Sequence, residues 1–154
     1  MEFQNTIAYG TFTNGGAELT LSDGVWTQFP FIPRCKICKN TNVPATNTFK
    51  IQVQETGMYF VEFSFIAQDG DGKSYSIRPY VNGIEYGSGG TAMQIKFYQQ
   101  PTTQKYEVST HGLFALTKGD IVEWRIYTVT LSATDFFTRD LVMNVMNLQQ
   151  IGIH

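Results

Sequence analysis

Residues 48–67, TFKIQVQETGMYFVEFSFIA, decide the fold that this sequence predicts. In the first part of the stretch, the apolar side chains of Phe49, Ile51 and Val53 alternate with polar ones. A period of two places successive side chains on opposite sides of an extended chain. The pattern therefore predicts a β-strand with one buried face and one wet face.

A second strand follows residues 55–57, where Gly57 can take the positive φ that a tight hairpin often needs. One face of this strand is apolar throughout, which predicts that it points into a core. The other face carries Met58, Phe60 and Ile66, which are too apolar for an ordinary solvated surface. A sandwich whose outer face meets another subunit explains both faces. We therefore predict that Met58, Phe60 and Ile66 lie in a subunit interface.

The composition fits one β-rich domain that covers the whole chain, residues 1–154. A chain of 154 residues can build a core without help from disulfides or metals. Aromatic residues make up 14% and charged residues only 16%, a balance that suits a β protein burying surface between subunits. The formal net charge of −2 offers no basic surface for nucleic acid, so we expect no such partner.

The sequence has neither a secretory signal nor a membrane span. Residues 1–10 lack a basic start and an apolar core, and no apolar run reaches the length of a transmembrane helix. We therefore expect no membrane insertion. Two interpretations stay open: the protein reaches its destination without the secretory pathway, or the sequence is cut from a longer one. Residues 1–12 are predicted to form a first strand or an anchoring segment.

Turn signals divide the chain into about eight to ten short strands, and no long segment has helical periodicity. The best hairpin signal is Asn82-Gly83. Further turns are predicted at residues 14–16 and 118–120, a long surface connection with at most a short strand at residues 34–47, and a loop at residues 132–140. Many short strands separated by regular turns predict an antiparallel sandwich or barrel.

Three segments, taken in order, resemble motifs of a known family. They are GMYFVEF at residues 57–63, PYVNG at residues 79–83 and GLFALTKGDIV at residues 112–122. These segments resemble the globular head of the C1q and tumour-necrosis-factor superfamily. The resemblance implies an all-β, antiparallel jelly-roll sandwich of about ten strands, which assembles as a compact homotrimer.

The resemblance has limits that bear on function. Ile51 and Pro44 stand where the family has Phe and another large residue, and the chain has no collagen-like stalk. These departures argue against an animal complement-type protein. Heads of this kind also occur on viral and phage fibres, capsid decorations and bacterial spore surfaces, and such a fold fixes function poorly.

The motifs with chemical potential lack the partners that their chemistry needs. Cys35 and Cys38 have the C-x-x-C spacing, but neither a helix start for redox chemistry nor a second ligand pair for zinc accompanies them. We interpret them as loop cysteines without a cofactor and leave their pairing open. Asp69 and Asp71 resemble the opening of a calcium loop, yet Tyr80 occupies the position of the bidentate Glu. A turn is the favoured interpretation, and a weak surface calcium site stays open.

Catalysis is not indicated by the sequence. Ser109, His111 and Asp120 lie near one another in the chain, but nothing supplies an oxyanion hole or a nucleophile elbow. We therefore predict no catalytic residues, no metal site, no cofactor and no enzymatic activity.

We predict a non-enzymatic, homotrimeric structural protein of a virion surface: a spike, fibre head or capsid decoration. Its partners would be its own copies, the viral particle or fibre stalk, and a host-surface receptor or glycan. The alternative is a secreted signalling or pattern-recognition ligand domain. Because the strands are committed to core and interface, ligand contacts are expected on loops. The candidate loops are residues 68–73, 99–104 and 132–139, with Tyr98, Phe136 and Phe137 as ligand-binding side chains.

Overall fold

The structure is a computed structural model that describes most of the chain. It gives the backbone of residues 8–22, 24–29, 32–45, 47–68, 73–87, 95–99, 106–128 and 136–152. Within these ranges it gives the side chains of all residues except 14–22, 66–68, 73–74, 95–99, 106, 128 and 136–144.

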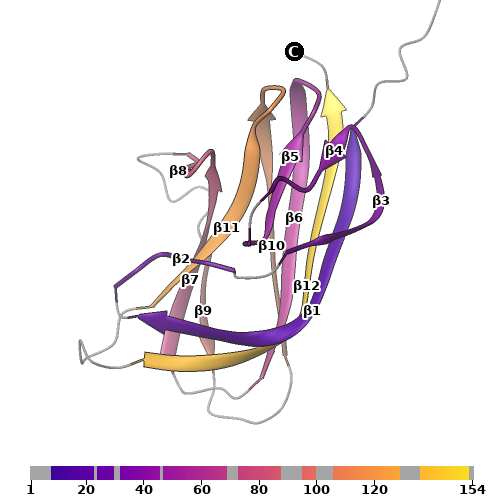
Figure 1. Cartoon of the computed structure of the whole chain (residues 1–154). Helices are drawn as coiled ribbons and strands as arrows, with labels where there is room; N and C mark the ends of the chain where they lie inside the picture. Colours follow the sequence, from indigo (N-terminus) through magenta and orange to yellow (C-terminus); the bar gives the residue numbers. More distant parts are fainter. Residues whose placement is uncertain are drawn as a thin grey trace, which may run out of the picture.

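Two antiparallel sheets face each other (Figure 1). The five-stranded sheet has the order β10-β6-β12-β1-β3, formed by Tyr106–Leu116, Gly57–Gln68, Phe136–Gly152, Tyr9–Ser22 and Arg34–Lys39. The seven-stranded sheet has the path β4-β5-β11-β7-β8, formed by Thr41–Asn42, Lys50–Val53, Ile121–Thr128, Lys73–Val81 and Ile84–Glu85. In addition, β2 (Thr27–Gln28) pairs with β11, and β9 (Ile95–Gln99) pairs with β7. Neighbours in each sheet are mostly distant in sequence, as in a jelly roll, so the predicted all-β architecture is confirmed.

Aromatic side chains from both sheets fill the space between them. Phe63, at the centre of β6, stacks on Trp124 of β11 with ring centroids 5.9 Å apart. Phe29 meets the Phe63 ring edge-on with centroids 5.0 Å apart, and Phe49 meets it edge-on at 6.0 Å. The predicted alternation is confirmed, because the core-facing residues of residues 48–65 are all buried: Phe49, Ile51, Val53, Tyr59, Val61, Phe63 and Phe65.

The predicted hairpin between the two strands of residues 48–67 is wrong. β5 and β6 belong to different sheets, so residues 54–56 cross from one layer to the other. Gly57 is required for a different reason than a positive φ. A Cβ at this position would lie 2.3 Å from the carbonyl oxygen of Gly152, so only glycine lets β6 start this close to the end of β12.

The chain around residues 14–16 forms a strand and not the predicted turn. β1 continues through Asn14 and Gly15 and pairs with β12 from Tyr9 to Ser22. β12 is 17 residues long and offers a partner along the whole of β1, which outweighs the local turn preference. Glycines inside a strand often mark a bend, and both strands curve together across the foot of the sandwich (Figure 1).

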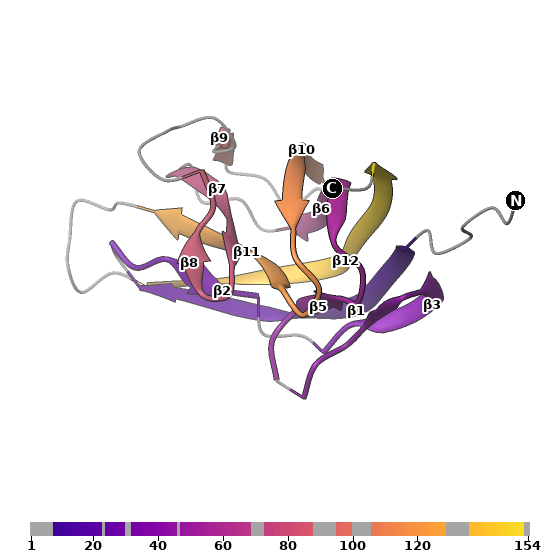
Figure 2. The same ribbon diagram turned by 90° about the horizontal axis from the view of Figure 1, so that it is seen from above.

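Two further segments contain more paired strand than the sequence predicted. Residues 34–47 contain β3 and β4, and β3 forms the edge of the five-stranded sheet, at the opposite margin from β7 and β9 (Figure 2). The predicted loop at residues 132–140 is replaced by the start of β12 from Phe136 onward, because β1 supplies partners down to Ser22.

The strongest turn signals behave as predicted. Asn82 and Gly83 have φ values of 53° and 78°, as a two-residue type I′ turn requires, and they join β7 to β8. Gly119 has a φ of 96° in the turn between β10 and β11. Asp120 closes that turn by accepting the backbone N–H of Thr117 at 2.8 Å.

We predict a loss of stability at alkaline pH that arises from Tyr59. Its hydroxyl donates to the backbone oxygen of Glu55 at 2.6 Å, and burial, aided by the charge of Glu55, raises the pKa of Tyr59 to about 12. The folded state thus keeps a proton that the unfolded chain loses near pH 10, so stability is intact below about pH 10 and falls as pH rises toward about 12. At about 1.4 kcal/mol per pKa unit, the fall is at most about 3 kcal/mol.

Urea unfolding at pH 9 and pH 11 measures this fall, and Tyr59→Phe should make the pH dependence shallower. Burial, as the largest cause, also raises the pKa of Tyr80, so a smaller slope remains in the variant. Tyr9→Phe, at an exposed position, serves as the control. An unchanged slope in Tyr59→Phe would contradict the assignment.

We also predict that Gly57→Ala destabilises the fold by about 1–3 kcal/mol, because the added methyl group collides with the backbone of β12. The midpoint of thermal unfolding measures the effect, and Ser109→Ala on the exposed side of β10 is the control. Equal midpoints for Gly57→Ala and the wild type would show that β12 can move away at no cost.

Candidate functional site

The face of the five-stranded sheet that points away from the core is the candidate functional site, called here the outer face. Directly paired residues of antiparallel strands share a face, so the register places side chains in rows across the sheet. One row consists of Leu113, Phe60, Gln149, Tyr9 and Lys39. The next row consists of His111, Glu62, Asn147, Thr11 and Ile37.

A groove of about 480 Å³ crosses the middle of the outer face. The aromatic rings of Phe60 and Tyr9 belong to its lining on opposite sides, from β6 and β1. In the neighbouring row, Glu62 accepts a hydrogen bond from the side-chain amide of Asn147 at 3.1 Å. The groove is therefore lined by both polar and apolar residues: Tyr9, Gly10, Thr11, Phe60, Glu62, Asn147, Leu148 and Gln149.

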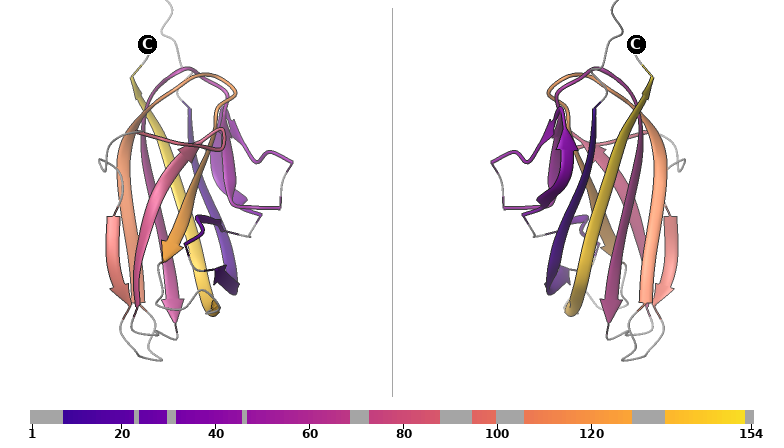
Figure 3. Two further views of the ribbon diagram at one scale, coloured as in Figure 1. Left: turned by 90° about the vertical axis from the view of Figure 1, so that its left-hand side faces the viewer. Right: turned by 90° about the vertical axis from the view of Figure 1, so that its right-hand side faces the viewer.

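Large apolar side chains stand exposed around this groove. Leu113 is 49% exposed, Ile37 is 60% exposed and Ile151, at the end of β12, is 56% exposed. Within the described residues no third layer covers this sheet, and the right-hand view of Figure 3 shows β1, β12, β6 and β10 side by side. Several large apolar side chains exposed together on one uncovered face mark a surface that contacts another protein.

The structure places two of the three predicted interface residues on this face. Met58 pairs with Ala115, and Phe60 pairs with Leu113; both Met58 and Phe60 are half-buried in the isolated chain. The Phe60 ring also packs at 5.5 Å from the ring of His111. Ile66 belongs to β6, but its side chain lies outside the described residues. The subunit interface itself stays a prediction.

The predicted ligand-binding residues lie on strands. Tyr98 in β9 pairs with Ser74, while Phe136 and Phe137 open β12 and pair with Ser22 and Leu21. Their side chains lie outside the described residues, as do residues 69–72, 100–104 and 132–135 of the predicted loops. Asp69 and Asp71 fall in the first of these segments. The ligand role of these residues stays a prediction.

Of the residues considered for catalysis, Asp120 is not brought to the other two. Ser109 and His111 are both exposed on β10, and because β10 pairs with β6 without a register shift, they share one face of the sheet. The carboxylate of Asp120 is engaged elsewhere, with the side chain of Asn82 at 2.9 Å and the backbone N–H of Thr117 at 2.8 Å. In the described part of the chain, no cluster of His, Cys, Asp and Glu could hold a metal ion.

A second cluster of functional-looking residues covers the outside of the seven-stranded sheet. The Trp26 ring stacks on Tyr127 at 4.7 Å, and the Arg78 guanidinium lies 4.6 Å from the Trp26 centroid. Arg125 lies 4.2 Å over the Tyr80 ring. Sequence analysis did not find this cluster, because its members are far apart in the chain. Its contacts hold the segment around Trp26 against β11 and β7.

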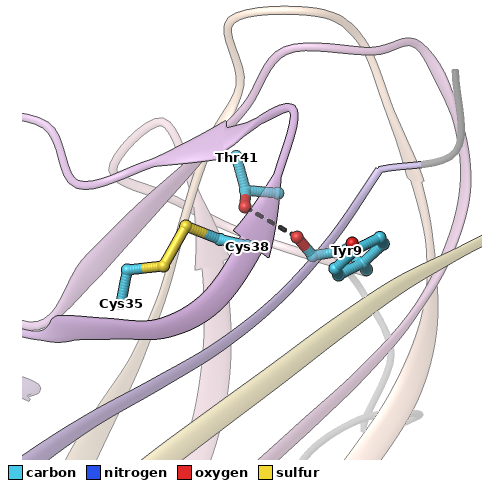
Figure 4. The surroundings of a disulfide bond; sticks show 4 residues. All are labelled: Tyr9, Cys35, Cys38 and Thr41. Carbon is cyan, nitrogen blue, oxygen red and sulfur yellow. Dashed lines mark hydrogen bonds between the residues drawn. A yellow bond between two sulfur atoms is a disulfide. The ribbon is translucent and has the colours of Figure 1, made fainter.

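The structure also contains a disulfide between Cys35 and Cys38, with Cα atoms 6.1 Å apart (Figure 4). The sequence left this pairing open, and no framework of disulfides was predicted. Both cysteines lie on β3, where every residue is exposed. Nearby, the Thr41 hydroxyl donates to the backbone oxygen of Tyr9 at 2.9 Å, which ties β4 to β1.

Comparison with known proteins defines the class of fold. No family model matches the sequence. No curated protein matches it significantly. Among the described residues, no helix is long and apolar enough to cross a membrane.

Solved structures match over nearly the whole chain. Eiger TNF from S. frugiperda is 14% identical with a TM-score of 0.66, covering 97% of this chain and 96% of its own. The globular domain of zebrafish complement 1qA is 13% identical with a TM-score of 0.53, covering 94% and 99%. Murine APRIL is 13% identical with a TM-score of 0.52, covering 92% and 98%. The chain therefore has an all-β, antiparallel jelly-roll fold of the C1q/TNF-like type.

Proposed function

We propose that this protein is a non-enzymatic ligand domain that assembles as a homotrimer through the outer face and binds a receptor outside the cell. The observation that carries the proposal is the exposed apolar rim around the groove on that face. Solved structures with the same fold are a TNF, an APRIL and a complement 1qA domain, and the fold resemblance implies trimeric, receptor-binding heads.

Energetics support self-association at the outer face. Complete burial of one Phe or Leu side chain contributes about 1.5–3 kcal/mol, and three-fold symmetry repeats each contact in every subunit. Phe60, Leu113 and Ile151 would all gain from burial. The hydrogen-bonded pair of Glu62 and Asn147 supplies polar groups whose positions restrict how a second copy can dock.

Such a trimer has two candidate locations, outside the cell as a secreted ligand or on the surface of a virion. The comparisons support a secreted signalling or recognition ligand more than a virion spike, fibre head or decoration protein, because the similar solved structures are a TNF, an APRIL and a complement 1qA domain. The virion surface stays a second interpretation. The receptor or glycan contacts are proposed at Tyr98, Phe136 and Phe137, away from the outer-face rows that the trimer would bury.

Phe60→Asp tests the assembly. We expect the wild type to have three times the chain mass of 17.4 kDa in light scattering, and the variant to dissociate because a carboxylate would be buried without a partner. Leu113→Asp should act in the same way at an exposed position, where folding of the monomer is not at risk.

Ile84→Asp is the matched control, since Ile84 is an aliphatic residue that is 70% exposed in the other sheet. It should leave the trimer intact. A wild-type monomer, or trimers that persist in both outer-face variants, would remove the outer face as the assembly site.

Replacement of Phe136 and Phe137 by Ala tests the proposed ligand contacts. Binding to a glycan array and to cultured cells should weaken by about tenfold or more, as expected for aromatic anchors of an interface. Val25→Ala, at an exposed apolar residue of another segment, is the control. Unchanged binding by an intact trimer would exclude these two residues, and a wild type that binds nothing would favour a purely structural role.

A further inference from the structure

The disulfide between Cys35 and Cys38 closes across an irregularity in the edge strand. β1 pairs Thr11 with Ile37 but Phe12 with Cys35, so Lys36 is an extra residue on β3 and forms a β-bulge. In a regular strand, residues three apart are separated by about 10 Å. The Cα atoms of Cys35 and Cys38 are only 6.1 Å apart, within the upper limit of about 6.8 Å for a disulfide. Closure of this disulfide therefore requires the bulge.

We propose that this disulfide is a site of reversible exchange with dithiols, and that its redox state sets the pairing register of β3. The disulfide and the bulge stabilise each other. Because the disulfide closes only in the bulged strand, it stabilises the bulge while it is intact, and reduction of the disulfide removes this stabilisation. The reduced strand is then free to regain regular pairing with β1.

The exchange needs a dithiol reductant, either a small molecule or a dithiol oxidoreductase. One thiolate of the reductant attacks the sulfur of one cysteine, and the other cysteine leaves as a thiolate. The second thiolate of the reductant then attacks the mixed disulfide and releases the first cysteine. Two electrons and two protons pass to the protein, Cys35 and Cys38 end as thiols, and the reductant ends as a disulfide.

The site is accessible to such a reductant. All six residues of β3 are exposed, and within the described strands β3 pairs only with β1, at the margin of the sheet. Arg34 and Lys36 flank Cys35 in the chain, and positive charge favours a departing thiolate. The pair lies on a strand, without the helix start of catalytic C-x-x-C sites, so it acts as a substrate of exchange and not as an oxidoreductase.

The two ends of β3 differ in how they are held. Beyond Lys39, the backbone oxygen of Asn40 accepts a hydrogen bond from Gln54 at 2.8 Å, and Thr41 is tied to Tyr9. The end near Lys39 is therefore fixed, and the segment of Arg34 to Lys36 is the part that moves.

A slip of one residue in this segment exchanges the faces of its side chains. Cys35 now pairs with the inward-facing Phe12, and Arg34 pairs with Thr13, which lies on the outer face. Removal of the bulge brings Lys36 opposite Phe12 and Cys35 opposite Thr13. The redox state thus decides whether Arg34 or Cys35 is presented at that corner of the outer face.

Hydrogen exchange of the folded protein before and after treatment with dithiothreitol tests the proposal. We expect both thiols to become available to iodoacetamide without denaturant. Backbone exchange of Arg34–Lys36 should change by tenfold or more, while the centre of β6 around Val61 is unaffected, and reoxidation should restore the original pattern.

The control is a double variant, Cys35→Ser with Cys38→Ser, which should fold, match the reduced wild type and ignore dithiothreitol. Modification of the thiols only after global unfolding would overturn the proposal, as would identical exchange in the oxidised and reduced proteins. Because the readout is local to β3, its failure is distinguishable from a failure of the proposed trimer.

Discussion

The stack of Phe63 on Trp124 is the contact on which the rest of the structure depends. It joins the centre of one sheet to the centre of the other and is enclosed by the rings of Phe29, Phe49 and Phe114. Because Phe63 points into the core and side chains alternate along a strand, the direction of every neighbouring side chain on β6 is fixed. Phe60, Glu62 and Ser64 must point outward, so the packing of the core determines which side chains form the outer face.

The outer faces of the two sheets are different in kind. On the seven-stranded sheet, Arg125 pairs with the buried Glu123 at 3.2 Å, and Arg78 pairs with Glu85 at 2.6 Å, while aromatic rings lie beneath both guanidinium groups. That face satisfies its own charges. The five-stranded sheet instead leaves Leu113, Ile37 and Ile151 exposed around a groove, whereas the exposed Ile84 of the seven-stranded sheet lies in β8 at the end of that sheet. This asymmetry is why the second face, and not the first, is the candidate for a partner.

The sequence correctly predicted features that depend on residues close together in the chain. Its predictions were wrong where pairing between distant strands determines the structure. The alternation of apolar and polar residues correctly predicted which residues of β5 and β6 are buried and which point outward. The Asn82-Gly83 pair correctly predicted a type I′ turn. Residues 54–56 look like a hairpin, yet only long-range pairing decides that β5 joins β11 while β6 joins β12. The sequence left the pairing of Cys35 and Cys38 open, because the bulge that brings the two cysteines together arises only from long-range pairing of β3 with β1.

The edge strand β3 connects the two proposals without making one depend on the other. Ile37 and Lys39 extend the rows of the outer face, and both lie on the side of the bulge that the contacts of Asn40 and Thr41 hold in place. Arg34 and Cys35 lie on the other side, next to Thr13 at the corner of the face. A change of register between Arg34 and Lys36 therefore alters one corner of the outer face and leaves the rows that contain Phe60 and Glu62 unchanged. Assembly and redox state are separable for this geometric reason, and any coupling between them has to pass through that corner.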